Sequence, residues 1–304
     1  MKSLWTKGWF VFFIALICCG LWGSAAPFIK MGYTFFSIEA NDVASILLFA
    51  GSRFALAGGL VLIYYALFRK SKERISWSIL PAILVLAFFQ TAGQYYFYYI
   101  GLAHTSGVNG AIITGMSAFF SLIVACLIFR FESFTSKKIL GCLLGFLGIL
   151  WMNRQAFGTN STFQWLGEGY VLVSQVCSAF SAAFIKYFTK KHDPVLLSGC
   201  QFMLGGIALV VIGISMGGQL QMSHQEGFMD LFYLACVSAV AYTLWGLLLQ
   251  KNPVSKVGIY NCLIPIIGVI ISAFLLHEYE QAFQVDNLIS LVLICLGIFL
   301  VSKK

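Results

Sequence analysis

Long apolar stretches separated by short polar loops run through the whole chain. A helix that crosses the hydrocarbon core of a bilayer needs about 20 apolar residues, and ten stretches approach or exceed that length. Five of them fall in each half of the 304 residues. The pattern therefore predicts an all-α integral membrane protein with ten transmembrane helices. The expected spans are residues 9–30, 43–68, 77–100, 106–129, 136–153, 168–189, 194–216, 228–250, 255–276 and 286–302.

The two halves of the chain repeat each other. Gly-Ser-Arg-Phe at residues 51–54 recurs as Gly-Cys-Gln-Phe at residues 199–202, an offset of 148. Because each half has an odd number of spans, the second copy must cross the membrane in the opposite sense to the first, as the halves of many transporters do. We therefore expect one membrane domain built from two inverted five-helix repeats, residues 1–153 and residues 154–304.

Composition and charge agree with a membrane protein. Hydrophobic residues make up 60% of the chain and charged residues only 10%, whereas soluble domains have about 25% charged residues. The net charge of +8 does not predict nucleic-acid binding here, because the basic residues gather in alternate loops. With the N-terminus inside, sixteen of them lie on the inner side and only Lys30 and Arg154 on the outer side. This bias predicts that both termini are cytoplasmic.

Polar side chains inside the expected spans mark a candidate site. In the third span, Gln90, Gln94 and Tyr98 recur every four residues and share one helical face. In the second copy, Tyr242 corresponds to Gln94 at an offset of 148, and Trp245 lies close to the same face. Two repeat-related polar and aromatic faces would meet near the middle of the membrane. For Tyr98 a role as an interfacial anchor is the alternative.

Two asparagines and a proline interrupt the fourth and ninth spans. Asn109 and Asn261 place amide groups where a polar side chain is costly. Pro265 frees a backbone carbonyl in mid-span, which then needs a partner or a wet cavity. The serines of the fourth and sixth spans are as well explained by close helix packing.

Arg53 is the only charged residue near the middle of an expected span. Its guanidinium could be a counter-ion for a substrate carboxylate, or it could tie together carbonyl groups of neighbouring helices. Gln201 occupies the equivalent place in the second copy and can tie helices without a charge, which favours the second role. No Asp or Glu is expected at mid-span, since Glu168 lies at the outer end of the sixth span and Asp230 is counted with the acids on the outer side, so the sequence predicts no carboxylate proton relay of the usual kind.

The sequence contains no pattern that predicts catalysis. Residues 213–217 match the G-x-S-x-G pattern, but a hydrolase elbow needs a strand–turn–helix context, and this stretch ends a membrane helix. The nine cysteines all lie in apolar segments without C-x-x-C spacing, which indicates small apolar filler. We expect no enzyme activity, no disulfide framework, no metal ion, no cofactor and no nucleic-acid partner.

Short motifs recur in order across both halves, in addition to the ten spans in about 300 residues. They are Trp22-Gly23, Arg53-Phe54, Gly101-Leu102, Thr105, Glu132, Gly141, Gly148, Pro253, Pro265, Glu278 and Gly297. With these residues the chain resembles the drug/metabolite transporter superfamily, specifically its EamA type. The proline usually found in that family near residues 117–119 and the tryptophan often present in its sixth span are missing, which concerns local kinks only.

The resemblance implies a multi-pass protein of the inner membrane whose central cavity is lined by spans 1, 3, 4, 6, 8 and 9. Such proteins mostly export amino acids and related metabolites. Together with the polar periodicity, it predicts the following substrate-binding residues: Trp22, Arg53, Gln94, Tyr98, Asn109, Tyr242, Trp245 and Asn261.

Three alternatives remain at this stage. The aromatic residues of the third and eighth spans could cage an organic cation, as expected of an uptake carrier or facilitator. A lipid-handling or structural membrane protein would lack paired polar faces between the repeats. Gly141 and Gly145 in the fifth span could pack against another helix of the chain or form the face of a homodimer.

Overall fold

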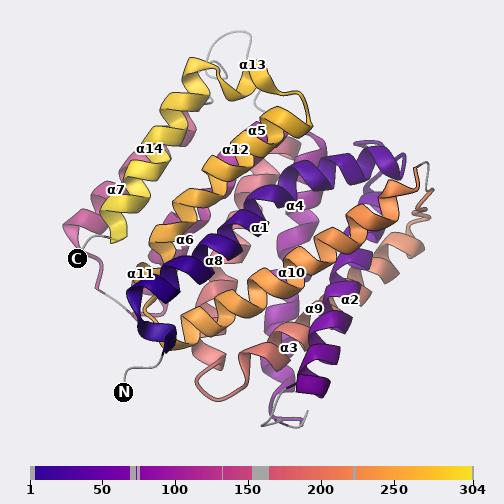
Figure 1. Ribbon diagram of the computed structural model, residues 1–304, viewed down its shortest axis with the longest axis horizontal. Helices are drawn as coiled ribbons and strands as arrows, with labels where there is room; N and C mark the ends of the chain where they lie inside the picture. Colours follow the sequence, from indigo (N-terminus) through magenta and orange to yellow (C-terminus); the bar gives the residue numbers. More distant parts are fainter. Residues whose placement is uncertain are drawn as a thin grey trace.

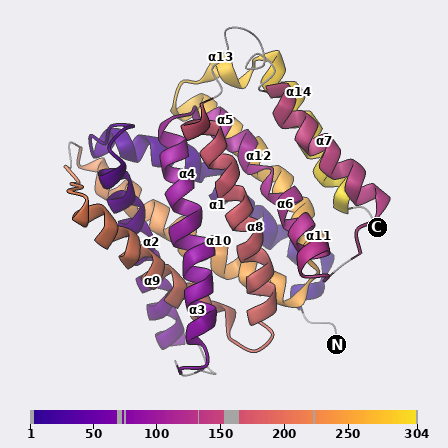
Figure 2. The same ribbon diagram turned by 180° about the vertical axis from the view of Figure 1, so that it is seen from behind.

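The computed structural model describes residues 4–68, 73, 76–131, 133–152, 164–221 and 224–302, apart from the side chains of residues 255, 259, 301 and 302. In this part of the chain all regular structure is helical, and the helices form one bundle (Figures 1 and 2). The expected all-α class is therefore confirmed. Outside the described residues lie the expected boundary between the halves at residues 153 and 154 and the basic residues Lys2, Arg69, Lys70, Lys72, Arg74, Arg154, Lys303 and Lys304.

Eight helical segments of the described chain are long and apolar enough to cross a membrane. Four of them are single helices, and four are interrupted. The single helices are α1 (Gly8–Phe35), α2 (Val43–Phe68), α9 (Pro194–Ser215) and α10 (Glu226–Lys251). The interrupted spans join α3 (Leu80–Leu86), η2 (Ala87–Ala92) and α4 (Gly93–Ala103); α5 (Gly107–Thr114), α6 (Ser117–Ile123) and η3 (Val124–Ile128); η5 (Trp165–Gly169) and α8 (Tyr170–Phe188); and α11 (Val254–Gly258), η6 (Ile259–Cys262) and α12 (Leu263–Leu275).

The fifth span expected in each half corresponds to a shorter helix. These helices are α7 (Ser136–Met152), of 17 residues, and α14 (Val285–Ser302), of 18 residues. They lie side by side at one edge of the bundle (Figures 1 and 2). Two short helices, η1 (Leu4–Thr6) and α13 (Tyr279–Ala282), complete the described structure.

The interruptions have local causes. In the third span, six residues adopt the wider π-helical winding, and the Gly93 N–H bonds back to the carbonyl of Phe88. In the fourth span, the N–H groups of Gly115 and Met116 bond to carbonyls only three residues earlier, which tightens the turn. In the ninth span, Pro265 is the third residue of α12, where its missing N–H breaks no bond inside the helix.

The tightest helix pair in the bundle is α2 against α9, which approach backbone to backbone. A Cβ atom added to Gly51 would lie 2.7 Å from the carbonyl oxygen of Gly206, and one added to Gly58 would lie 3.0 Å from that of Gly199. Gly51 and Gly199 stand 148 residues apart, as do Gly58 and Gly206. The two glycine contacts are therefore equivalent under the offset that relates the halves.

The pair α7 and α14 shows the same reciprocity at an offset of 149. A Cβ atom on Gly148 would lie 3.0 Å from the carbonyl oxygen of Ser290, and one on Gly297 would lie 2.6 Å from that of Gly141. A Cβ atom on Gly297 would also meet the backbone nitrogen of Gly145 at 3.1 Å. The backbone at Gly141 and Gly145 therefore packs against Gly297 of α14, and the open side of Gly145 faces the ring of Phe119 on α6, both within the chain.

Two lysines cap equivalent helix ends. Lys30 Nζ on α1 donates a 2.6 Å hydrogen bond to the carbonyl oxygen of Thr105, just after α4. Lys186 Nζ on α8 donates a 2.7 Å hydrogen bond to the carbonyl oxygen of Asn252, just after α10. Thr105 and Asn252 are 147 residues apart. Cationic groups at helix C-termini satisfy carbonyls that have no partner within the helix.

Candidate functional site

A polar cavity of about 90 Å³ lies at the centre of the bundle. Its wall is built by α1, α2, η2, α4, α5, α6, α8, α10, η6 and α12. A second hollow of about 30 Å³ shares Ser121, Ala182, Trp245 and Asn261 with it and continues past Leu249. The main cavity has room for several water molecules, since one water needs about 10–15 Å³ of such space.

Seven of the eight residues predicted from the sequence line this cavity. They come from helices that are distant in sequence, so the fold brings them together. The seven are Trp22, Arg53, Gln94, Tyr98, Tyr242, Trp245 and Asn261.

Asn109 is the predicted residue that does not line the central cavity. It lies in the first turn of α5, where its N–H is capped by the hydroxyl of Ser106 at 3.1 Å. Its side chain borders a separate hollow together with Lys30, Glu168 and Gln281. The sequence cannot place it, because the break after Thr114 changes which face of the fourth span is directed at the cavity.

The interruptions of the spans supply further polar groups to the cavity wall. Gln90 lies in η2, Thr114 and Ser117 flank the break between α5 and α6, and Asn261 lies in η6. The broken segments therefore contribute polar groups to the cavity wall.

Arg53 both ties helices together and forms part of the cavity wall. Its side chain is 1% exposed. Its Nε donates to the carbonyl oxygen of Leu234 at 3.0 Å and to the hydroxyl of Ser238 at 3.1 Å. Its Nη1 donates to the hydroxyl of Tyr99 at 2.8 Å. The helix-tie role is thus present, and Arg53 is also one of the residues that line the cavity.

A matching contact without charge exists in the other half. Thr91 donates a 2.5 Å hydrogen bond to Oε1 of Gln201. Arg53 and Gln201 are 148 residues apart, and Thr91 and Ser238 are 147 residues apart. The Arg53–Ser238 and Gln201–Thr91 contacts are therefore equivalent, but only the first carries a positive charge.

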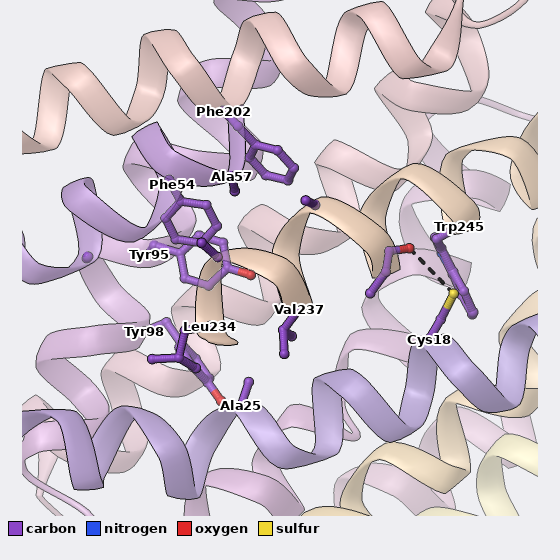
Figure 3. Packing of buried hydrophobic residues seen from close by; sticks show 14 of the residues in the cluster. Cys18, Ala25, Phe54, Ala57, Tyr95, Tyr98, Phe202, Leu234, Val237 and Trp245 are labelled. Atoms are coloured by element: carbon purple, nitrogen blue, oxygen red, sulfur yellow. Dashed lines mark hydrogen bonds between the residues drawn. The ribbon is translucent and has the colours of Figure 1, made fainter. Parts of the chain in front are cut away.

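Aromatic pairs line the join between the halves. The rings of Phe54 and Phe202, 148 residues apart, have centroids 5.5 Å from each other, and the ring of Tyr95 lies 4.1 Å from that of Phe54 (Figure 3). The hydroxyl of Tyr95 hydrogen-bonds to that of Tyr242. Tyr242 thus meets Tyr95, 147 residues away, and also has a side-chain hydrogen bond with Gln94, the residue that the sequence pairs with it.

Trp22 closes the aromatic part of the wall. Its ring centroid lies 5.0 Å from that of Tyr242 and 5.0 Å from that of Trp245, with the rings close to edge-on. Edge-to-face pairs of this kind are favourable beyond the area that they bury. The result is a rigid apolar surface next to the polar groups.

Four polar atoms on these wall residues are buried without a hydrogen-bond partner among the described residues. Two are donors, Nε1 of Trp22 and Nε2 of Gln90, and two are acceptors, Oε1 of Gln94 and Oδ1 of Asn261. Leaving such groups unpaired is costly. A ligand that carries both acceptors and donors would relieve this cost.

The sequence of this chain matches a known family over both halves. The family is described as the EamA-like transporter family, and its profile matches residues 8–154 and again residues 165–303. The chain belongs to the EamA-like transporter family. This confirms the resemblance stated from the motifs, and it makes the chain a multi-pass membrane transporter by family.

Relatives along the full length agree with this assignment. A protein of Archaeoglobus fulgidus named "Uncharacterized transporter" is 26% identical over 98% of this chain and 99% of its own. A protein of Escherichia coli named "Probable amino-acid metabolite efflux pump" is 25% identical over 94% of this chain and 93% of its own. A solved crystal structure superposes with a TM-score of 0.69 over 97% of this chain and 98% of its own, at 12% identity, which shows a shared fold.

The sequence analysis did not predict the burial of Asp230. Asp230 on α10 is 5% exposed, and neither of its carboxylate oxygens has a hydrogen-bond partner among the described residues. It lies in the second turn of the helix, near the end of the span where the sequence placed it. What the sequence could not predict is that α1 and α2 cover the carboxyl group.

Proposed function

We propose that this EamA family member is a secondary transporter that moves small amphipathic metabolites, such as amino acids, by alternating access around the central cavity. The proposed direction is export. It would have ten transmembrane helices arranged as two inverted repeats, residues 1–153 and 154–304, in the inner membrane with both termini cytoplasmic.

Reciprocal contacts support the inverted repeats. Gly51 contacts Gly206 as Gly199 contacts Gly58, and the pair of α7 and α14 repeats the pattern at the edge of the bundle. Contacts of equivalent residues with each other are expected where two copies face one another around a twofold axis. The Tyr95–Tyr242 hydrogen bond is such a contact.

The polar groups of the cavity support an amino acid as the substrate class. A carboxylate would accept from the guanidinium of Arg53 and from the free donor of Trp22. The acceptor oxygens of Gln94 and Asn261 suit an ammonium group, which offers only donors. The ring of Trp245 offers an apolar surface for a side chain. The presence of Arg53 and free donors and acceptors on one buried wall is the observation that carries the proposal.

Arg53 and the unpaired polar atoms of the cavity favour this proposal over an organic-cation carrier and over a structural or lipid-handling protein. An organic cation would have to approach a buried guanidinium that has no carboxylate bonded to it, which is unfavourable. A purely structural or lipid-handling protein gains nothing from unpaired donors and acceptors in a closed centre. The names of two full-length relatives, both "Probable amino-acid metabolite efflux pump", support export of amino-acid-like compounds.

Counterflow in proteoliposomes tests the proposed function. Vesicles loaded with unlabelled L-phenylalanine should accumulate external radiolabelled L-phenylalanine transiently, because exchange through one site needs no driving ion. Competition by L-amino acids should exceed competition by phenethylamine, which lacks the carboxylate, and by choline. Protein-free vesicles are the control. Equal competition by choline would favour the organic-cation carrier, and exchange of none of these compounds would contradict the proposal.

A further inference from the structure

Asp230 is a buried carboxyl group that the tertiary contacts leave without a donor. It lies in the second turn of α10, which begins at Glu226. Both oxygens are buried and unpartnered within the described structure. The stabilising effect of a helix N-terminus on an anion is confined to the first turn, so the dipole of α10 does not account for an ionised group at this position.

The packing around Asp230 holds the carboxyl group against neighbouring helices. A Cβ atom on Gly32 of α1 would lie 2.7 Å from Oδ2 of Asp230. Phe49 of α2 is buried beside the same glycine. A carboxylate enclosed in this way by a glycine backbone and a phenyl ring has no solvent to stabilise its charge, and such a group relieves the cost by binding a proton.

Asp230 and the contacts of Arg53 lie on one face of α10. Leu234 and Ser238, which accept hydrogen bonds from Arg53, follow Asp230 at intervals of four residues. Side chains with this spacing stand above one another on a helix. Arg53 makes no hydrogen bond to the Asp230 carboxyl group, but its first contact on α10, the carbonyl oxygen of Leu234, lies one helical turn further along the helix.

Few other titratable groups share this region. Tyr99 of α4 accepts a hydrogen bond from Arg53, and the hydroxyl of Tyr33 of α1 donates to the carbonyl oxygen of Tyr99 at 2.8 Å. Nearer the outer end are His224, whose ring lies 5.8 Å from that of Phe35, and Glu226, which is exposed. Among these described groups Arg53 is the buried cation, so it is the group through which a charge on Asp230 would reach the cavity.

We propose that Asp230 is a proton-binding site linked through Arg53 to the central cavity, so that a substrate carboxylate binds at Arg53 together with uptake of one proton at Asp230. The ionised Asp230 and a substrate carboxylate would compete for the positive charge of Arg53. Protonation converts Asp230 to a neutral acid and leaves Arg53 available to the substrate. The substrate part of this inference rests on the proposed function, whereas the proton site does not.

The linkage fixes the relation between proton and substrate movement. A proton bound together with the substrate travels in the same direction as the substrate. An inward proton gradient would therefore oppose export. Net export would occur only when the outward concentration gradient of the metabolite exceeds the inward driving force on the proton.

Infrared difference spectroscopy tests the proton site without any substrate. The wild-type protein in lipid bilayers should show the C=O stretching band of a protonated, buried carboxyl group that disappears at high pH. Asp230→Asn should remove this band. Glu226→Gln, an exposed acid on the same helix, is the matched control and should keep it. An unchanged band in Asp230→Asn would overturn the proposal. If that variant does not fold, Asp230→Glu should retain the band at a shifted frequency, and an unshifted band would equally overturn it.

Calorimetry tests the linkage. At a pH where Asp230 is ionised in the free protein, binding of L-phenylalanine should be accompanied by uptake of close to one proton. The number of protons taken up is obtained from binding enthalpies measured in buffers of different ionisation enthalpy. Phenethylamine, without a carboxylate, should bind without this uptake, and so should L-phenylalanine to Asp230→Asn. Equal proton uptake with both compounds would overturn the linkage. If L-phenylalanine does not bind to the wild type, the proposed substrate class has failed, and the infrared result still decides the proton site.

Discussion

Tyr95 and Tyr242 hydrogen-bond to each other through their hydroxyl groups at the centre of the bundle, although 147 residues of sequence separate them. Both rings line the cavity. The contact joins equivalent positions of the two halves. A single bond of this kind contributes about 1 kcal/mol in a protein.

The Tyr95–Tyr242 bond predicts a non-additive pair of variants. Tyr95→Phe and Tyr242→Phe should each weaken apparent affinity for L-phenylalanine by several-fold, and the double variant should lose little more than the worse single one. The reason is that either substitution removes the same bond. A double-mutant cycle on counterflow affinity measures this, and additive losses would show that the two hydroxyl groups act separately.

Arg53 should matter more than its counterpart Gln201. Arg53→Ala removes bonds to Leu234, Ser238 and Tyr99, and it takes the positive charge from the cavity. Gln201→Ala leaves the hydroxyl of Thr91 without its acceptor and changes no charge. Counterflow should therefore fall at least tenfold more in Arg53→Ala, since charged hydrogen bonds contribute about 1.5–3 kcal/mol. Equal loss of binding of L-phenylalanine and phenethylamine in a folded Arg53→Ala would exclude the counter-ion role.

Trp245→Ala and Gln94→Ala should change which substrates are preferred while the protein still folds. The first removes an aromatic surface from the cavity wall and the second removes an acceptor. We expect Trp245→Ala to weaken binding of aromatic amino acids more than that of alanine, as measured by competition in counterflow. Trp9→Ala is the matched control, because Trp9 is 64% exposed on α1, away from the cavity. A uniform loss for all substrates in Trp245→Ala would contradict the assignment.

The glycine contacts between α2 and α9 should be intolerant of side chains. In Gly206→Ala the new Cβ atom would lie 2.9 Å from the carbonyl oxygen of Gly51. Backbone atoms cannot move aside as a side chain can, so we expect a loss of about 1–3 kcal/mol and a lower thermal midpoint in detergent. Gly20→Ala is the control, since nothing lies within 4 Å of its added Cβ atom. Equal midpoints for the two variants would refute the packing argument.

The basic bias predicts the sidedness of the loops. In a variant without the native cysteines, Gln219→Cys should react with a membrane-impermeant maleimide added outside intact cells, and Lys191→Cys should react only after the cells are opened. Both positions are exposed at ends of α9. Labelling in the reverse order would overturn the cytoplasmic location of the termini.

Hydropathy was sufficient to predict the helices but not the way in which they break. The eight long spans follow from runs of apolar residues, because the free energy of transferring such a run from water to lipid depends little on which helices pack against it. The π-helical turn before Gly93 depends on one backbone bond to Phe88, and such a bond leaves no trace in composition. The offset of 148 pairs Gln94 with Tyr242, and these side chains do meet, but the contact of Tyr242 with Tyr95 was not predicted.

The candidate site could be predicted in part for a similar reason. Gln94 and Trp245 stood out by their place on polar and aromatic helical faces that the repeat relates, and Arg53 as the one charged residue near the middle of an expected span. Asp230 did not, because the cost of a carboxyl group depends on whether a donor lies opposite to it, and that is a property of α1 and α2. The face of Asn109 likewise depends on the break in the fourth span.

The reciprocal glycine contacts also have a consequence for synthesis. The ribosome completes α2 long before α9, and α7 long before α14. The glycine face of α2 therefore remains without its partner in the membrane until α9, in the second half, has been made. Contacts between residues so far apart in sequence form slowly, because the loop between them must close first. The first half should thus remain loosely packed and accessible to membrane chaperones and proteases until the last helix has been inserted.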